Sequence, residues 1–284
     1  MDRIVQLPFI PFIHSAEDVL FAGFVFARVF GLFLISPLLS NPHISGTVRS
    51  LLSVFVATLL ILTNYGSYRG EAPRYELPIF NLNHEWTIVL VAIAFLKEVA
   101  IGFLIGFCFS LIFEALLFAG QIASFLIGFS LAELFDPISG VTQALLSQIF
   151  VLVGFLLMLS SDLHHSFLRT LSDSFEVLPI GNYHLNHETL QTVSSGTARL
   201  WEYAMQLTAI PFVILFLVTV GLGFMAKIMP EMNIFMLGFP LKIFIGYYAL
   251  IVAVGFFPLI LQEAFVEFDN LARLIIGQIA RGDV

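Results

Sequence analysis

The sequence from Trp86 to Phe135 reads WTIVLVAIAFLKEVAIGFLIGFCFSLIFEALLFAGQIASFLIGFSLAELF, and it decides the fold. It is strongly apolar and carries only four charges, Lys97, Glu98, Glu114 and Glu133, and it contains no proline that would end a helix. A single helix over this stretch would be about 75 Å long, whereas the hydrocarbon core of a bilayer is about 30 Å thick. We therefore expect the stretch to fold back on itself or to be partly buried in protein, as in a part of a larger assembly.

The composition indicates an integral membrane protein or a subunit wrapped in other apolar subunits. Of the 284 residues, 59% are hydrophobic and 11% are charged, whereas a soluble domain carries about 25% charged residues. The 12 lysines and arginines are scattered, which argues against nucleic-acid binding. With one cysteine, Cys108, no intramolecular disulfide is possible. The N-terminal residues show no small-residue cleavage site after a short apolar core, so we expect no cleavable signal peptide.

Other apolar segments surround the long stretch. They are expected at about 19–39, 48–63, 144–160, 205–226 and 234–261, with polar regions at 64–85 and 161–202. Pro211, Pro240 and Pro258 lie inside the last two segments, where an interior proline kinks or breaks a helix. These segments predict an all-α, polytopic, membrane-associated fold of helical hairpins with kinked helices.

Small residues recur at four-residue spacing in two parts of the long stretch. One stripe consists of Gly102, Gly106 and Ser110, and the other begins with Gly120 and Ser124. Such stripes let another backbone approach closely, although ordinary packing of small residues would explain either stripe alone. Two stripes in adjacent arms favour a tight hairpin, with the chain reversing between Glu114 and Gly120.

The tail from Glu263 to Arg281 has an apolar and a polar face. Its polar face is acidic, so docking on a partner is favoured over lying on a membrane surface. Asp269 and Arg273 are spaced for an i,i+4 ion pair.

Charges inside apolar segments are candidates for function, because isolated charges are costly in hydrocarbon. They are Arg28, Lys97, Glu98, Glu114, Glu133 and Lys242. They could line a polar or proton-linked path, but ion pairs that fix helix register explain them more simply. We expect Arg28 to pair with either Glu98 or Glu114 across helices.

Signals for metal binding and catalysis are weak. His164 and His165 are adjacent, and His184 and His187 are three apart, but no cysteine supports them, so we expect solvated histidines and no metal. The GxSxG, HExxH and Walker-type motifs are absent from the sequence. An intramembrane serine protease would need a histidine base on a neighbouring buried helix, and no histidine follows His187. We therefore expect no enzyme activity.

The sequence FDPISG, Phe135–Gly140, interrupts an apolar region. Aspartate, proline, serine and glycine are expected in a plain surface turn. Bulky residues precede this turn, and Gly128 adds flexibility. A loop of this kind could enter a pore as a hydrophobic constriction that closes it by excluding water.

Four stretches carry a recognisable combination of motifs in order. They are ARVFGLFLISPLLSNPHISGTVR (Ala27–Arg49), GQIASFLIGFSLAELFDPISG (Gly120–Gly140), SFEVLPIG (Ser174–Gly181) and PEMNIFMLGFPLKIFIG (Pro230–Gly246). Together they resemble the FliR family of type III export-gate subunits, which has flagellar and injectisome branches. The Leu-Pro-Ile-Gly and Asn-Ile-Phe elements favour the flagellar branch.

The resemblance implies a non-enzymatic, cofactor-free subunit of the flagellar basal body in the bacterial inner membrane. It implies assembly with FliP and FliQ inside the basal-body ring, with FlhA and FlhB completing the export machine. Helical hairpins of the subunits would spiral around a channel for unfolded flagellar subunits. Residues 1–200 would be FliP-like, and residues 201–284 would be FliQ-like.

The resemblance also assigns a channel plug to the loop from Gly128 to Gly140. Its candidate residues are Gly128, Phe129, Leu131, Leu134, Phe135, Asp136, Pro137 and Gly140. Glu133 departs from the family pattern, which is small or uncharged there, and it would make the constriction less dry if it faced the lumen. The remaining alternatives are injectisome use and a secondary transporter, which the proline-broken segments suggest.

Overall fold

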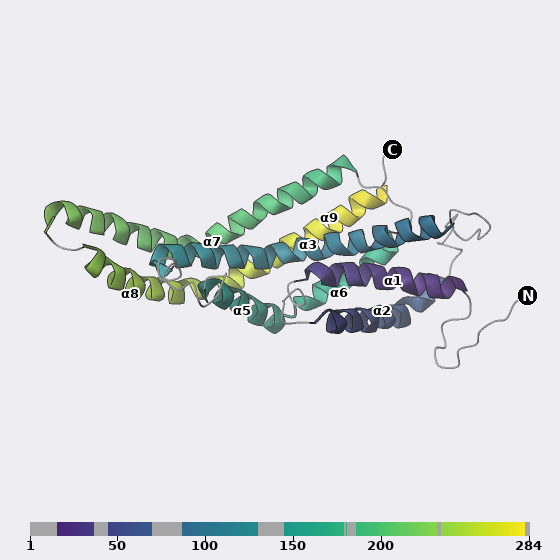
Figure 1. The fold of residues 1–284 in the computed structure, drawn as a ribbon. Coiled ribbons are helices and arrows are strands. Elements are labelled where there is room, and N and C mark those ends of the chain that lie inside the picture. Colours follow the sequence, from purple (N-terminus) through teal and green to yellow (C-terminus); the bar gives the residue numbers. More distant parts are fainter. Residues whose placement is uncertain are drawn as a thin grey trace, which may run out of the picture. The chain divides into compact units, whose positions relative to one another are not determined.

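The computed structural model describes residues 16–36, 45–69, 87–129, 145–178, 180, 186–231 and 234–281. The expected all-α fold is confirmed there, since these residues form helices and no strand. The helices are α1 (Ala16–Ile35), α2 (Gly46–Arg69), α3 (Thr87–Ile127), α5 (Leu145–Ser160), α6 (His164–Val177), α7 (His187–Ile228), α8 (Ile234–Val254) and α9 (Phe257–Arg281) (Figure 1).

The long apolar stretch is one uninterrupted helix, and the hairpin expected between Glu114 and Gly120 is wrong. Helix α3 has 41 residues and is therefore about 60 Å long. The chain turns only at Gly128, whose φ of 99° lies in the left-handed region. Its N–H donates to the carbonyls of Ser124 and Phe125 at 3.1 and 3.2 Å, so it caps the helix.

The other boundaries follow from proline and from packing. The expected break near Pro258 occurs just before it, between α8 and α9, whereas Pro211 and Pro240 lie inside α7 and α8. Much of the polar region expected at 161–202 is helical, because α6 and the start of α7 lie within it. The expected segment 205–226 is thus only the later part of a helix of 42 residues.

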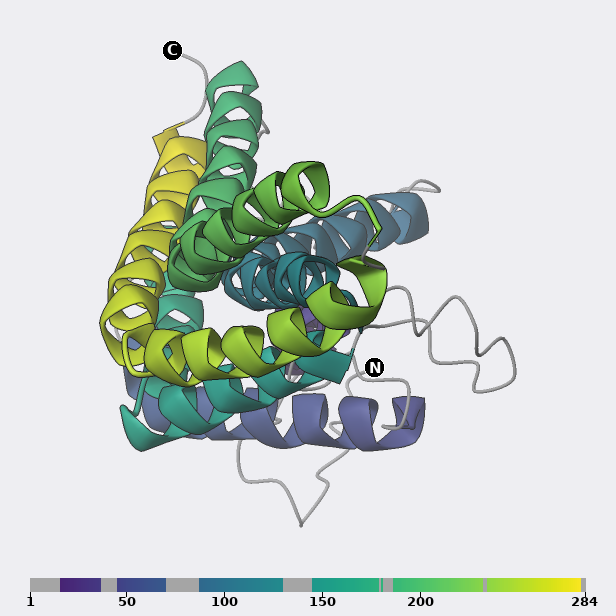
Figure 2. The ribbon, with the colours of Figure 1, turned by 90° about the vertical axis from the view of Figure 1, so that its left-hand side faces the viewer.

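The chain forms two compact units that interleave along the sequence. Unit 1 comprises Met1–Ser110, Ser166–Val193 and Asp269–Val284, and unit 2 comprises Leu111–His165 and Ser194–Phe268. In unit 1, α1 packs on α2, and Phe24, Ala94 and Ile180 form a buried apolar cluster. In unit 2, α7 and α9 run side by side (Figure 1 and Figure 2), and the Phe150 and Phe257 rings meet edge to face at 5.0 Å.

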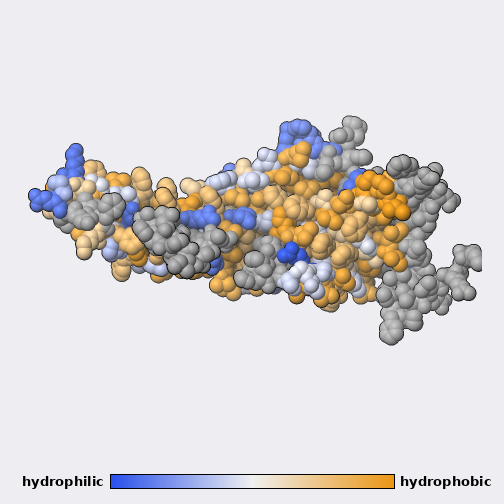
Figure 3. All heavy atoms as spheres, viewed as in Figure 1, coloured by the Kyte–Doolittle hydropathy of each residue, from blue (hydrophilic) through white to orange (hydrophobic). Residues whose placement is uncertain are grey.

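Several helices are long and apolar enough to cross a membrane. In the described parts of the chain these are Asp18–Ile35, Gly46–Thr63, Ile88–Ile127, His187–Ile228 and Met236–Val254, with α5 and α6 as a possible sixth, broken span. Only 11% of the Gly46–Thr63 segment and 11% of the most apolar window of α7 are buried within the chain. Hydrophobic residues accordingly cover most of the coloured surface in Figure 3. Lipid or other protein must cover these faces.

Candidate functional site

Arg28 is a fully buried charge in unit 1. It lies on α1 with 0% of its side chain exposed, and its Nε donates to Glu98 Oε2 on α3 at 2.7 Å. Glu98 is also fully buried. Of the two acids expected as partners for Arg28, the structure therefore pairs it with Glu98. Glu114 is exposed on the same helix, four turns further along.

The remaining donors of Arg28 bind the end of α6. Nη1 donates to the carbonyl of Ser174 at 2.9 Å and to its Oγ at 3.1 Å, and Nη2 donates to the carbonyl of Leu178 at 3.2 Å. The Ser174 carbonyl, in the last turn of α6, also accepts from the Leu178 N–H at 2.9 Å, and the Leu178 carbonyl lies just beyond the helix. A cation is favoured at such a helix C-terminus. The guanidinium also lies 4.2 Å from the centre of the Phe175 ring. One side chain thus joins α1, α3 and the C-terminus of α6.

Glycines bring α1 and α3 into backbone contact around this ion pair. A Cβ on Gly102 would overlap the carbonyl oxygen of Arg28, and one on Gly106 would lie 2.6 Å from that of Leu32. On the other side, a Cβ on Gly31 would overlap the backbone of Val99. Ser110 donates instead to the carbonyl of Phe107 in its own helix, at 2.8 Å. The small residues therefore set how closely Arg28 approaches Glu98.

The second stripe of α3 contacts a different helix, within unit 2. A Cβ on Gly120 would overlap the backbone of Ser147 on α5, and Ser147 Oγ donates to the carbonyl of Leu117 at 3.0 Å. Ser124 is buried, and its hydroxyl has no hydrogen-bond partner among the described residues. Because the two stripes face two different helices, they do not require α3 to fold onto itself.

Most of the expected plug lies outside the described residues. Leu131, Glu133, Leu134, Phe135, Asp136, Pro137 and Gly140 fall in the gap after Phe129. Gly128 and Phe129 are described. The Phe129 ring meets Tyr247 of α8 edge to face at 5.9 Å, and a Cβ on Gly128 would lie 3.2 Å from the ring of Phe239. The end of α3 that leads into the expected plug is therefore held against α8.

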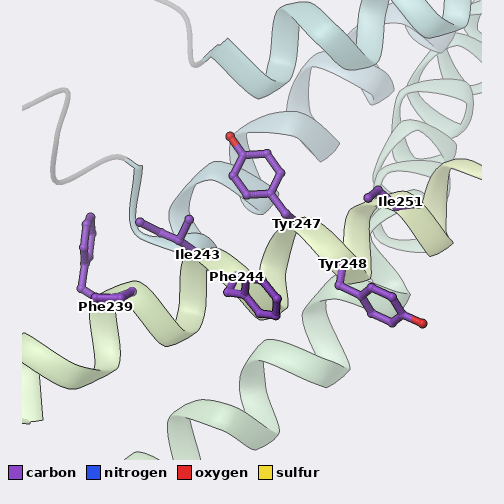
Figure 4. A pocket seen from close by; sticks show the side chains of 7 residues that line it. Phe239, Ile243, Phe244, Tyr247, Tyr248 and Ile251 are labelled. Atoms are coloured by element: carbon purple, nitrogen blue, oxygen red, sulfur yellow. The ribbon is translucent and has the colours of Figure 1, made fainter.

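An open apolar hollow of about 610 Å³ lies along α8 (Figure 4). Its lining is Phe239, Pro240, Ile243, Phe244, Tyr247, Tyr248 and Ile251. These residues contain no carboxylate, imidazole, thiol or amine, and their polar side-chain groups are the hydroxyls of Tyr247 and Tyr248. Its composition suits apolar contact rather than chemistry.

The other charged candidates are less enclosed. Lys97 and Lys242 are partly exposed on α3 and α8. The described part of the chain shows one cluster of metal-type ligands, formed by Asp162, His164 and His165 between α5 and α6.

The C-terminal helix is amphipathic as expected, but its apolar face is buried within the chain. Ile275 and Ile279 are each 2% exposed, so this face is not free to dock on a partner. The expected pair is present, because Arg273 Nε donates to Asp269 at 2.9 Å, and its Nη1 also reaches Asp173 of α6 at 2.5 Å. These hydrogen bonds, first to Asp269 and then to Asp173, raise the pKa of Arg273.

A polar cluster in unit 2 was not foreseen from the sequence. Arg199 donates to Glu202 at 2.9 Å and pairs with Glu267 at 3.2 Å, and the Tyr203 hydroxyl also donates to Glu267. These contacts join α7 to α9. The i,i+3 spacing of Arg199 and Glu202 was the one signal available, and it did not reveal the third partner.

Comparison with known proteins gives consistent matches over most of the chain. The family model described as "Bacterial export proteins, family 1" matches residues 19–268. A protein of Escherichia coli K12 called "Flagellar biosynthetic protein FliR" is 26% identical over 253 residues, covering 89% of this chain and 91% of the relative. Proteins with the same name from Bacillus subtilis 168 and Aquifex aeolicus VF5 are 26% and 30% identical, covering 88% and 67% of this chain and 93% and 73% of the relatives.

Proposed function

Because the chain belongs to family 1 of the bacterial export proteins, we propose that it is a non-enzymatic core subunit of the flagellar protein-export gate. The match of this family over residues 19–268 is the observation that carries the proposal. Relatives named for flagellar biosynthesis match nearly the same range, which favours the flagellar branch. Together with the apolar helices, these matches place the chain in the bacterial inner membrane as a multi-pass protein.

Helix length and exposure support assembly with other subunits. Helices α3 and α7, with 41 and 42 residues, are each about 60 Å long, roughly twice the thickness of the hydrocarbon core. Lipid can cover only part of such a helix, so the rest needs protein around it. FliP and FliQ are the partners that we propose, inside the basal-body ring and with FlhA and FlhB nearby. The assembly would pass unfolded flagellar subunits.

We retain the internal division of the chain as part of the proposal, with a FliP-like part over residues 1–200 and a FliQ-like part over residues 201–284. Each compact unit described above contains segments from both parts. The units reflect contacts within the chain, whereas the proposed division reflects likeness to FliP and to FliQ. Cross-linking each part separately to FliP and to FliQ would test the division. The division would be contradicted if FliP and FliQ each cross-linked equally well to both parts.

The plug is proposed for the loop that follows α3. Its support is local: Gly128 ends α3 in a left-handed conformation, and Phe129 packs on Tyr247. These contacts fix where the loop begins. A loop anchored in this way and carrying Leu131, Leu134 and Phe135 has the bulk to exclude water from a channel.

The test of the proposed function is co-expression with FliP and FliQ of the same organism, followed by native mass spectrometry of the material purified through this chain. We expect a discrete complex that contains this chain and several copies of both partners. The matched control carries Gly277→Ala in α9, because a Cβ there meets nothing within 4 Å, and it should assemble like the wild type. Assembly of FliP and FliQ without this chain, together with solute uptake into liposomes by this chain alone, would refute the proposal in favour of a transporter.

A further inference from the structure

The turn between α5 and α6 has an unusual residue at its key position. The Leu163 N–H donates to the Met158 carbonyl at 3.1 Å, and the Asp162 N–H donates to the Leu159 carbonyl at 3.3 Å. This pair of hydrogen bonds is a Schellman motif, whose left-handed residue is usually glycine. Here it is Asp162, with φ of 53°, which is the one positive φ among the described residues other than glycine. A residue with a side chain therefore occupies a backbone conformation that favours glycine.

Asp162 faces two imidazoles. One potential ligand atom each from Asp162, His164 and His165 lies within 4.8 Å of the others, and the two histidine rings have centroids 4.2 Å apart. His165 Nδ1 is 3.8 Å from the carboxylate of Asp162 and 3.3 Å from its carbonyl oxygen. Adjacent histidines on a regular helix diverge, but at the first turn of α6 these two lie side by side.

His164 carries the second observation. Its Nδ1 is buried and has no hydrogen-bond partner in the part of the chain that the structure describes. A buried polar atom without a partner is costly, so natural proteins rarely leave one. An exposed ion pair between Asp162 and His165 would explain those two side chains, but it would leave the His164 nitrogen unexplained.

We propose that Asp162, His164 and His165 bind a divalent transition-metal ion of the zinc class. Two imidazole nitrogens and one carboxylate oxygen are a ligand set that such ions accept, with water completing the coordination. Ligand atoms about 2.1 Å from one tetrahedral ion lie about 3.4 Å apart. The three ligand atoms lie within 4.8 Å of one another, and the side chains of Asp162 and His165, which are 78% and 58% exposed, have room to rotate toward that spacing. The ion would hold the end of α5 to the first turn of α6.

The proposal does not depend on the export function, and cobalt tests it directly. The full chain, purified in detergent with a histidine-free affinity tag, is titrated with Co²⁺ while its visible d–d absorption is recorded. We expect one Co²⁺ per chain, displaced by Zn²⁺. Asp162→Gly removes the carboxylate but supplies the residue that the turn prefers, so it should melt no lower than the wild type and bind Co²⁺ at least tenfold more weakly. His164→Ala should also bind at least tenfold more weakly.

His187→Ala is the control, because His187 lies outside the cluster, at the start of α7, and its loss should leave binding unchanged. If Asp162→Gly does not fold, Asp162→Asn replaces it, since asparagine also tolerates the left-handed region and its amide is a weaker ligand. The proposal is overturned if the wild-type chain shows no d–d absorption at tenfold excess Co²⁺. It is equally overturned if the Asp162 and His164 variants bind as tightly as the wild type.

Discussion

Removing the charge of Arg28 should destabilise unit 1 far more than removing a surface charge. In Arg28→Met, Glu98 keeps its carboxylate in a site with 0% exposure, but loses the donor at 2.7 Å. The Leu178 carbonyl loses its Arg28 donor as well, whereas the Ser174 carbonyl keeps the Leu178 N–H. Methionine fills much of the volume of the arginine stem, so the change tests the polar contacts rather than the packing.

The expected cost is about 3–5 kcal/mol, which is typical when one partner of a buried ion pair is removed. The Leu178 carbonyl, which loses its Arg28 donor, adds about 1 kcal/mol or more to this cost. At about 1.4 kcal/mol per factor of ten, the unfolding equilibrium shifts by two to almost four orders of magnitude. Arg28→Met combined with Glu98→Leu should recover part of the loss, because the buried carboxylate is then removed together with the guanidinium.

The measurement is reversible unfolding of the purified chain in mixed micelles, with the four variants of a double-mutant cycle. Arg199→Met is the matched control: Arg199 also pairs with a carboxylate, but its side chain is 52% exposed, so its loss should have little effect. If Arg28→Met costs no more than Arg199→Met, or if the double variant is the sum of the two single ones, the buried pair does not act as described.

Gly102→Ala should lower the melting temperature and the yield of assembled complex, because the added Cβ overlaps the Arg28 carbonyl. Gly277→Ala, whose Cβ meets no atom within 4 Å, should leave both unchanged, and equal effects of the two variants would contradict the close approach of α1 and α3. Ser147→Ala removes the hydrogen bond to the Leu117 carbonyl and should lower the free energy of unfolding by about 1 kcal/mol in the same assay. An unchanged free energy of unfolding would mean that this hydrogen bond adds nothing to the packing of α3 on α5. Deleting Leu131–Phe135 should make the closed assembly leak ions in planar bilayers, and an unchanged conductance would remove the plug assignment.

Composition together with the long apolar segments predicted the all-α, membrane-spanning class, because a helix satisfies its backbone hydrogen bonds within one segment in lipid. The reversal of α3 was predicted wrongly for a physical reason. Four-residue spacing shows that a helix face is flat, but it does not show which helix fills it. Gly102 meets α1 and Gly120 meets α5, so both stripes are used without a hairpin.

The site was predictable only in part. Arg28 stood out as a charge in an apolar segment, and the choice between Glu98 and Glu114 stayed open because both lie on α3. The acceptors at the end of α6 could not be inferred, since Ser174 and Leu178 lie 146 and 150 residues from Arg28. The grouping of Asp162 with His164 and His165 was not expected, because the sequence does not reveal that Asp162 adopts a left-handed conformation. The plug residues beyond Phe129 remain predictions.

The sparse burial of α2 and of the apolar part of α7 has a consequence for the cell. With 11% of each apolar window covered by its own chain, a copy that finds no partners presents the surface that quality-control proteases and chaperones bind. Unpartnered copies should therefore be degraded quickly, and the amount of this protein in a cell should follow the supply of its partners rather than its own rate of synthesis. Overproducing it alone would raise turnover instead of abundance.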